Sequence, residues 1–361
     1  TRDDRLARFA MSVFDYDRRS DGIVAMNFPT RGTQESSTYT MCWITMFRDY
    51  AYRGTNAAWL KSRLPGARNA MEGLALYENG DGFLEHLPGW SFVDWAPEYD
   101  NGVPGQGVVN FQYLYTLKLL AETEEALGET AYAKIWRAKA ERLAAKLQET
   151  LWDEKRGMMA DDAAGSRFSE HAQCLAILSG MFPEDLCGRM FEGLTGAKDL
   201  VRTSLYFSHY LFETYFRFGR ADLFFARLAV WKDQLAHGLK TAMETPRLES
   251  RSDCHAWSSG PLYALQAGVA GISPAAPFYR KVRVAPQPAH LKRIGCKAPH
   301  PDGFVEVNLD FSAGTADGAV SLPAGVTGVF EWKGVKTALK GGANVIGRGT
   351  RAGHKGLTDG S

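Results

Sequence analysis

The segment Thr241–Tyr263, TAMETPRLESRSDCHAWSSGPLY, holds two glutamates, a histidine and a tryptophan just after the predicted end of a helix. A carboxylate can take a proton from water, an imidazole can hydrogen-bond a hydroxyl, and an indole can stack on the C–H face of a pyranose. Glu244 and Glu249 are therefore candidate general bases, and His255 and Trp257 are candidate sugar-binding residues. The competing interpretations are a solvated surface carboxylate and an aromatic pair that packs at a helix start.

A second cluster, Leu87–Asp100 (LPGWSFVDWAPEYD), combines tryptophans with acidic residues between Gly-rich turns and a predicted long helix. A loop this apolar is expected to fold over another part of the protein. We predict that Trp90 and Trp95 stack on a sugar ring and that Asp94 hydrogen-bonds its hydroxyls. A purely structural plug is the alternative.

The charges of the chain are balanced, with 42 Lys and Arg against 41 Asp and Glu. This balance gives no basic surface for nucleic acid or for an anionic membrane. No apolar run approaches the roughly 18 residues of a membrane helix. Nine Trp and fourteen Tyr favour stacking on a neutral sugar. We therefore expect a carbohydrate partner, with no nucleic acid and no membrane.

The cysteines lack CxxC or Cys/His metal spacing and are interpreted as mostly reduced, buried thiols. They are Cys42, Cys174, Cys187, Cys254 and Cys296. Cys254 adjoins His255, but adjacent side chains rarely face each other, so a thiol nucleophile is disfavoured. No metal is predicted, and the chemistry proposed here needs no cofactor.

Apolar residues recur at three- and four-residue steps through most of the first 272 residues, which predicts helices. The expected helices are a first one carrying Leu6 to Phe14, then Ser37–Arg53, Asn56–Leu76, Pro104–Leu127, Glu129–Leu151, Ser166–Gly180, Pro183–Leu194, Thr203–Phe218, Arg220–His237 and His255–Ala270. Tyr39 and Trp43, one turn apart at a helix start, are more typical of a core than of a site. So many helical segments joined by loops predict a closed ring of hairpins with an inner and an outer layer.

The pattern changes at Tyr279, where short runs alternate apolar and polar residues between Gly, Pro and Asp. This alternation indicates an antiparallel sheet. We expect a mainly α chain with a helical barrel at 1–278, a small β-sandwich at 279–346 and a disordered Gly-rich tail at 347–361. The N-terminus lacks an initiator methionine and a signal peptide, so a larger parent protein is expected and the compartment is not indicated.

Four motifs in this order carry a family resemblance: TYTMCWITMFRDYAYRG, GWSFVDWAP, GLKTAMETPRLESRSDCHAW and KVRVAPQP. The chain resembles the C-terminal part of the family 78 α-L-rhamnosidases. The resemblance implies an (α/α)6 barrel followed by a β-sandwich, and inverting hydrolysis of terminal α-L-rhamnose from glycosides or polysaccharides, with a rhamnose-containing oligosaccharide or glycoside as the partner. It places the general base on Glu244, the pocket residues on His255 and Trp257, and the Trp-rich loop on Trp90–Trp95.

One departure from the family pattern concerns the general acid. In such enzymes the acid belongs to a Cys-Pro-Gln-Arg type motif upstream of the helix that opens this chain, and no such motif is present here. The first barrel helices are expected to be missing as well, and the chain alone is expected to be inactive. The alternatives are a non-catalytic carbohydrate-binding (α/α)6 module, or another (α/α)6 glycosidase such as a trehalase-like or glucoamylase-like enzyme.

Overall fold

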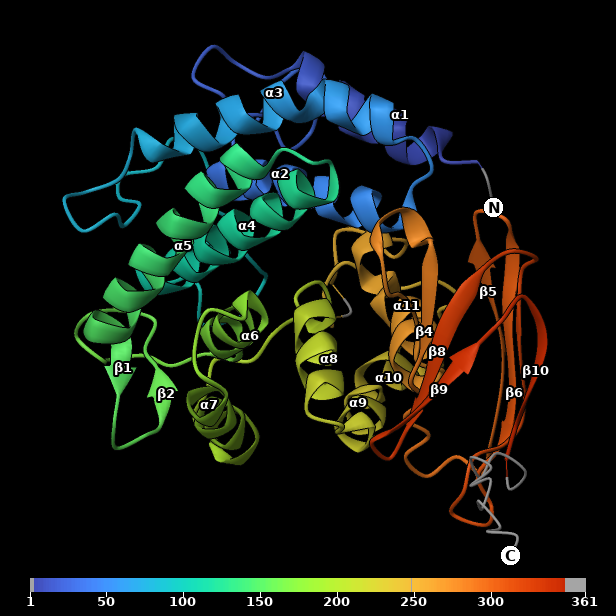
Figure 1. Ribbon diagram of the computed structural model, residues 1–361. Helices are drawn as coiled ribbons and strands as arrows, with labels where there is room; N and C mark the ends of the chain where they lie inside the picture. The colour runs from blue at the N-terminus through green and yellow to red at the C-terminus, as the bar shows by residue number, and fades with distance from the viewer. Residues whose placement is uncertain (1–2, 248, 348–361) are drawn as a thin grey trace, which may run out of the picture.

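The computed structural model describes residues 3–247 and 249–347 and consists of a helical part followed by two β-sheets (Figure 1). The helices are α1 (Arg5–Tyr16), α2 (Ser37–Arg53), α3 (Ala57–Ala75), α4 (Gln106–Ala126), α5 (Thr130–Leu151), α6 (Glu170–Ser179), α7 (Glu184–Gly196), α8 (Ser208–Arg217), α9 (Ala221–Arg227), α10 (Ala229–Ala236) and α11 (Gly260–Ala264). A short hairpin of β1 (Trp152–Asp153) and β2 (Met158–Met159) follows α5.

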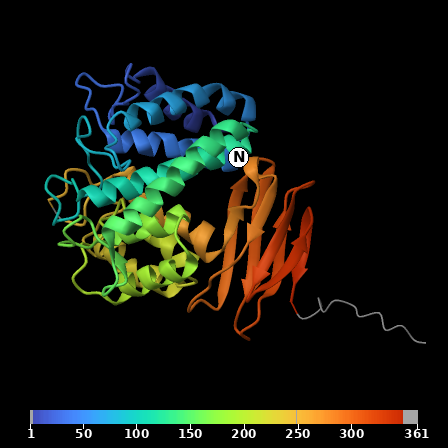
Figure 2. The same ribbon diagram turned by 60° about the vertical axis from the view of Figure 1, so that its left-hand side comes forward.

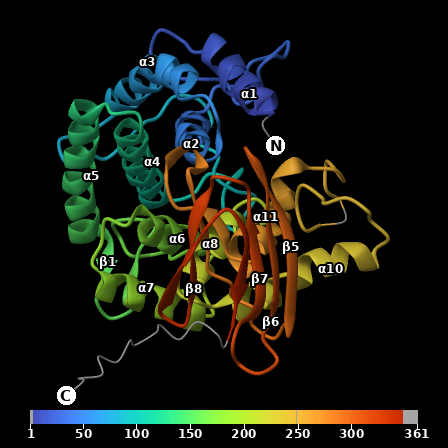
Figure 3. The same cartoon turned by 45° about the vertical axis from the view of Figure 1, so that its right-hand side comes forward.

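The helices form two layers, with α3, α5 and α7 outside α2, α4, α6 and α8 (Figure 3). Helix α4 is buried on all sides, whereas α5 buries one stripe that includes Trp136, Leu143 and Leu147. A helix that is apolar all round belongs inside a fold, and an amphipathic one covers its surface. The predicted two-layer arrangement of helical hairpins is therefore confirmed.

Two expected helices are interrupted. The segment Arg220–His237 divides at Leu228 into α9 and α10. The segment after His255 becomes a 3₁₀ turn (Ala256–Ser259), then α11, then a π turn (Leu265–Val269). A continuous helix from His255 would place Pro261 in its interior, where proline removes a hydrogen bond and clashes with the preceding turn. In the structure Pro261 lies in the first turn of α11, where its missing N–H costs nothing.

The two four-stranded sheets form the C-terminal part and stand beside the helices (Figure 2). One sheet has the order β3 (Ile272–Pro274), β4 (Lys281–Val284), β8 (Thr327–Trp332), β9 (Val335–Leu339), and the other β10 (Gly342–Ile346), β7 (Asp317–Leu322), β6 (Gly303–Asp310), β5 (Arg293–His300). All neighbours are antiparallel except β4 and β8, which are parallel. Alternate residues such as Val282 and Val284 are buried, as the period-two pattern predicted.

Strand β3, which precedes residue 279, pairs with β4. The Gln287 side chain donates to the carbonyl oxygen of Phe216 at 2.8 Å, and one apolar core continues from the helices into the sheets. The expected disordered tail lies outside the described residues, apart from Gly347.

Candidate sugar-binding and catalytic site

A cavity of about 530 Å³ lies where three long loops meet the start of α2. Its lining residues are Met26, Asn27, Gln34, Tyr39, Trp90, Phe92, Trp95, Arg251, His255, Ala256 and Trp257. These loops project from the helical part on the side away from the β domain (Figure 2). Four of the predicted site residues, Trp90, Trp95, His255 and Trp257, are thus brought together at one cavity.

The backbone around Glu244 is tied on both sides. Its N–H donates to the carbonyl oxygen of Ser252 at 2.8 Å, and its own carbonyl accepts from Trp257 Nε1 at 3.0 Å. The hydroxyl of Ser258 donates to the carbonyl oxygen of Met243 at 2.5 Å. These bonds close the segment into a compact loop, so the position of Glu244 is set by the residues that follow it.

The carboxylate of Glu244 is buried, and the residue is 1% exposed. Arg251 donates to it through two nitrogens, with Nη2 2.5 Å from Oε1 and Nε 3.1 Å from Oε2. Trp95 Nε1 also donates to Oε1, at 3.1 Å. A carboxylate has about four lone-pair positions, so these donors leave one position on Oε2 without a hydrogen bond from the described residues.

Aromatic rings form the walls of the cavity. Phe92 and Trp257 lie nearly parallel, with an interplanar angle of 6° and centroids 6.0 Å apart. The Trp95 ring meets Phe92 at 4.9 Å, and the His255 ring lies 4.1 Å from Trp257. Such surfaces suit the C–H faces of a sugar, while His255 adds a polar group for a hydroxyl.

Asp94 takes a different place from the one expected. It is fully buried, it does not line the cavity, and its oxygens accept hydrogen bonds from His171, Ser204 and Trp95. In this structure the carboxylate therefore lies behind the aromatic wall, where it bonds protein groups in place of sugar hydroxyls. Glu249, the other candidate base, is exposed on the surface.

Of the cavity residues that sequence reasoning did not assign to the site, three are aromatic or charged. Phe92 stands between the two tryptophans of the predicted cluster, and Arg251 belongs to the RSDCHAW motif, so the sequence motifs could have identified both. Tyr39, expected in the core, is half-buried and lines the cavity. Trp43 is a core residue, as expected, and its indole donates to the carbonyl oxygen of Met11 at 3.0 Å.

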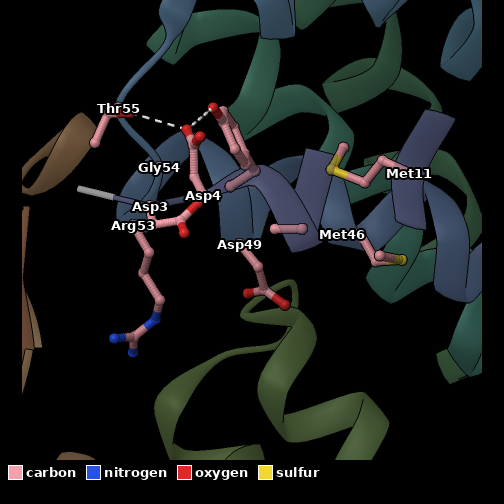
Figure 4. Close-up of a pocket in the computed structure, with 10 residues that line it drawn as sticks. Asp3, Asp4, Met11, Met46, Asp49, Arg53, Gly54 and Thr55 are labelled. Atoms are coloured by element: carbon pink, nitrogen blue, oxygen red, sulfur yellow. Dashed lines mark hydrogen bonds between the residues drawn. The ribbon is translucent and has the colours of Figure 1, made fainter. Parts of the chain in front are cut away.

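A second cavity, of about 360 Å³, lies between α1 and α2 (Figure 4). Asp3, Asp4 and Asp49 contribute carboxylates to it. Asp4 is engaged by Thr55 Oγ1 at 2.9 Å and by the hydroxyl of Tyr50. The aromatic wall of the first cavity has no counterpart here, so the first cavity is the better candidate for a sugar.

The described residues contain no group of three His, Cys, Asp or Glu side chains arranged to hold a metal ion. All five cysteines are free; Cys174 and Cys187 are buried as expected, whereas Cys42 and Cys296 are only partly buried and Cys254 is exposed. No helix within the described ranges combines the length and the apolar character needed to cross a bilayer.

Two layers of helical hairpins, with a buried glutamate and aromatic walls at their loop end, define the class of six-hairpin glycosidase folds. The family model described as the bacterial α-L-rhamnosidase six-hairpin glycosidase domain matches residues 4–269. The chain belongs to this family, and the resemblance and the (α/α)6 barrel with its β domain are confirmed. A search of curated proteins returned no match.

Solved rhamnosidase structures share the fold. The GH78 rhamnosidase of Bacillus sp. GL1 is 23% identical with a TM-score of 0.77, and the match covers 86% of this chain and 34% of that one. The α-L-rhamnosidase of Aspergillus terreus is 17% identical with a TM-score of 0.80, over 94% and 43%. A rhamnosidase from Klebsiella oxytoca, solved with rhamnose bound, is 21% identical with a TM-score of 0.64, over 72% and 53%. The chain thus spans between a third and about half of these proteins.

Proposed function

We propose that this protein is an α-L-rhamnosidase that hydrolyses terminal α-L-rhamnose from glycosides or oligosaccharides with inversion. The observation that carries the proposal is the buried carboxylate of Glu244, which does not line the cavity itself but accepts hydrogen bonds from two side chains that do, Trp95 and Arg251. Family membership supports the reaction class. Glu244 would take a proton from the water that attacks the anomeric carbon.

The general acid is expected outside the described residues. Inverting enzymes separate acid and base by roughly 6.5–9.5 Å so that a water molecule fits between them. Among the described residues that line the cavity, none carries a carboxyl group. Asp94 is close by in sequence, but both of its oxygens accept hydrogen bonds from the protein. We therefore assign Glu244 the role of base and leave the acid to another part of the protein.

The aromatic walls support a 6-deoxy sugar as the substrate. Rhamnose carries a methyl group where most hexoses carry a hydroxymethyl, so more of its surface is apolar. Trp90, Trp95 and Trp257 would contact this surface, and His255 would hydrogen-bond a hydroxyl.

The test is Glu244→Gln in the full-length protein, with nitrophenyl α-L-rhamnoside as the substrate. Loss of a general base is expected to lower kcat by about 10²- to 10⁴-fold while rhamnose binding is kept. Glu249→Gln is the matched control, because Glu249 lies in the same loop and is exposed. Inactive Glu249→Gln together with active Glu244→Gln would transfer the role to Glu249.

The stereochemistry is tested by following the first-formed anomer by NMR. Inversion of an α-rhamnoside releases the β-anomer first, and retention would overturn the assignment of a base.

A non-catalytic binding module remains the second candidate, because three hydrogen bonds already occupy the Glu244 carboxylate. Binding of rhamnose without hydrolysis of any nitrophenyl glycoside by the full-length protein would favour that module, and hydrolysis of a glucoside alone would favour a trehalase-like or glucoamylase-like enzyme.

A further inference from the structure

The Asp94 carboxylate is completely hydrogen-bonded inside the protein. Oδ2 accepts from His171 Nε2 at 2.8 Å and from the Ser204 N–H at 2.7 Å. Oδ1 accepts from the Trp95 N–H at 3.0 Å and from the Ser204 hydroxyl. These four donors match the about four lone-pair positions of a carboxylate. A buried carboxylate is costly unless it is satisfied in this way, so its position is closely defined.

The groups that hold Asp94 are themselves fixed to the inner helix layer. His171 lies in the first turn of α6, and the preceding Glu170 is also fully buried. Glu170 Oε2 accepts from the Thr203 N–H at 2.7 Å and from the Thr203 hydroxyl at 2.9 Å. Glu170 thus holds Thr203 directly, and His171 holds Ser204 through Asp94. These bonds anchor the segment with Thr203 and Ser204 to α6.

The other end of this chain of contacts reaches the candidate base. Trp95 bonds Asp94 through its backbone and Glu244 through its indole, over a sequence separation of 149 residues between Trp95 and Glu244. The other donor to the Glu244 carboxylate in the described part of the chain is Arg251, whose side chain is 76% exposed. The hydrogen bonds that link α6 to this carboxylate therefore pass through Asp94 and Trp95.

We propose that Asp94 is a positioning residue for the general base. It fixes the backbone of Trp95, and Trp95 in turn holds Oε1 of Glu244, so that the unoccupied position on Oε2 faces the attacking water. This inference rests on the proposed function, since it assumes that Glu244 is the base. Asp94 does not contact the sugar in this arrangement.

The test is a double-mutant cycle of Asp94→Asn and Trp95→Phe in the full-length protein. Trp95→Phe keeps an aromatic ring and removes the indole donor, and is expected to lower kcat about tenfold, as for one hydrogen bond to a charged group. KM is expected to change less than about threefold. In Asp94→Asn an NH2 group replaces one carboxylate oxygen and faces two hydrogen-bond donors, which it cannot bond. We therefore expect kcat to fall at least as far as in Trp95→Phe. The double variant is expected to be no slower than Asp94→Asn, because both changes remove the same contact.

Asp161→Asn is the control, because Asp161 is an equally buried aspartate that bonds Ser169 rather than Trp95. Its kcat is expected to stay unchanged. If Asp94→Asn does not fold, Ser204→Ala removes one donor and is expected to show a smaller kcat loss that disappears in the Trp95→Phe background.

Three results would overturn the positioning role: wild-type kcat in folded Asp94→Asn, additive losses in the cycle, or a fall in melting temperature with unchanged kcat. An active Glu244→Gln variant would instead overturn the proposed function, whatever the outcome of the cycle.

Discussion

At the scale of the residue, burial separates side chains that look alike in the sequence. Glu244 and Glu249 share one loop, yet one carboxylate is enclosed by Arg251 and Trp95 and the other is exposed. A buried carboxylate can be held in one orientation towards a reacting group, whereas an exposed one is solvated and mobile. His255 and Trp257 are both half-buried, and they differ in that the Trp257 indole bonds the carbonyl oxygen of Glu244.

His255→Ala is expected to weaken L-rhamnose binding about tenfold, the loss of one good hydrogen bond, with little change in stability. Trp257→Ala is expected to weaken binding and also to lower the free energy of unfolding by about 1–3 kcal/mol. The difference arises because Trp257 stacks on Phe92 and bonds the Glu244 carbonyl. Calorimetric titration and denaturant melts measure the two effects. If both changes lower the free energy of unfolding equally, His255 would be assigned a packing role.

Asp161 makes stability depend on pH. Its burial raises its pKa from 3.8 to about 6, and Ser169 Oγ bonds Oδ1 at 2.7 Å. Between about pH 4 and pH 6 the folded state therefore binds more protons than the unfolded state, and the free energy of unfolding falls as pH rises. This contribution amounts to about 3 kcal/mol. Urea melts of wild type and Asp161→Asn across this range test it, and an identical pH dependence in both would refute it.

At the scale of the element, glycine marks different features in different helices. Gly54 ends α2. Gly73 lies inside α3, where a Cβ would be 1.7 Å from the carbonyl oxygen of Asp21. Gly188 lies in α7 with nothing within 4 Å of a Cβ. The close approach of the Asp21 backbone therefore explains why residue 73 is a glycine. No such neighbour explains the glycine at residue 188.

Gly73→Ala and Gly188→Ala are expected to change stability in opposite directions. The added methyl at residue 73 forces the Asp21 segment away and is expected to cost about 1–3 kcal/mol, as overpacking does. The same change at residue 188 is expected to stabilise α7 by about 0.5–1 kcal/mol, because alanine loses less backbone entropy than glycine. Thermal melts of the two variants distinguish the cases. Stabilisation at residue 73 would contradict the close approach of the two segments.

At the scale of the whole molecule, large apolar side chains are exposed on both the first and the last helices. Leu6 and Phe9 of α1 are 81% and 65% exposed, and Leu262 of α11 is 67% exposed. The cavity of Figure 4 adjoins α1 on its α2 side. Exposed apolar residues grouped on one surface favour association with another protein surface.

Residues 1–361 expressed by themselves are expected to bind a hydrophobic dye and to self-associate. Changing Leu6 and Phe9 to Lys is expected to reduce both effects at least twofold, because it removes apolar area from α1. Leu76→Lys is the control, since Leu76 is 75% exposed but lies just after α3. Light scattering and dye fluorescence measure the outcome. An equal response to the Leu76 change would show that the α1 surface has no special role.

The sequence alone determined the helical part and the β-sheets, and it singled out the segment that carries Glu244, His255 and Trp257. The predictions of the fold succeed because periodicity and turn residues act between near neighbours in the chain. The sequence also identified the Trp-rich loop, but it did not show which of its side chains line the cavity and which are buried in the protein.

Only the tertiary structure decided how the loops face one another. Asp94 is turned into the protein by His171 and Ser204, and Trp95 meets Glu244 across 149 residues of sequence. Phe92 and Trp257 become a parallel pair only when their loops are brought together. A loop has no repeat that sets the direction of its side chains, so contacts between distant segments decide which carboxylate bonds the side chains that line the cavity and which one supports its wall from behind.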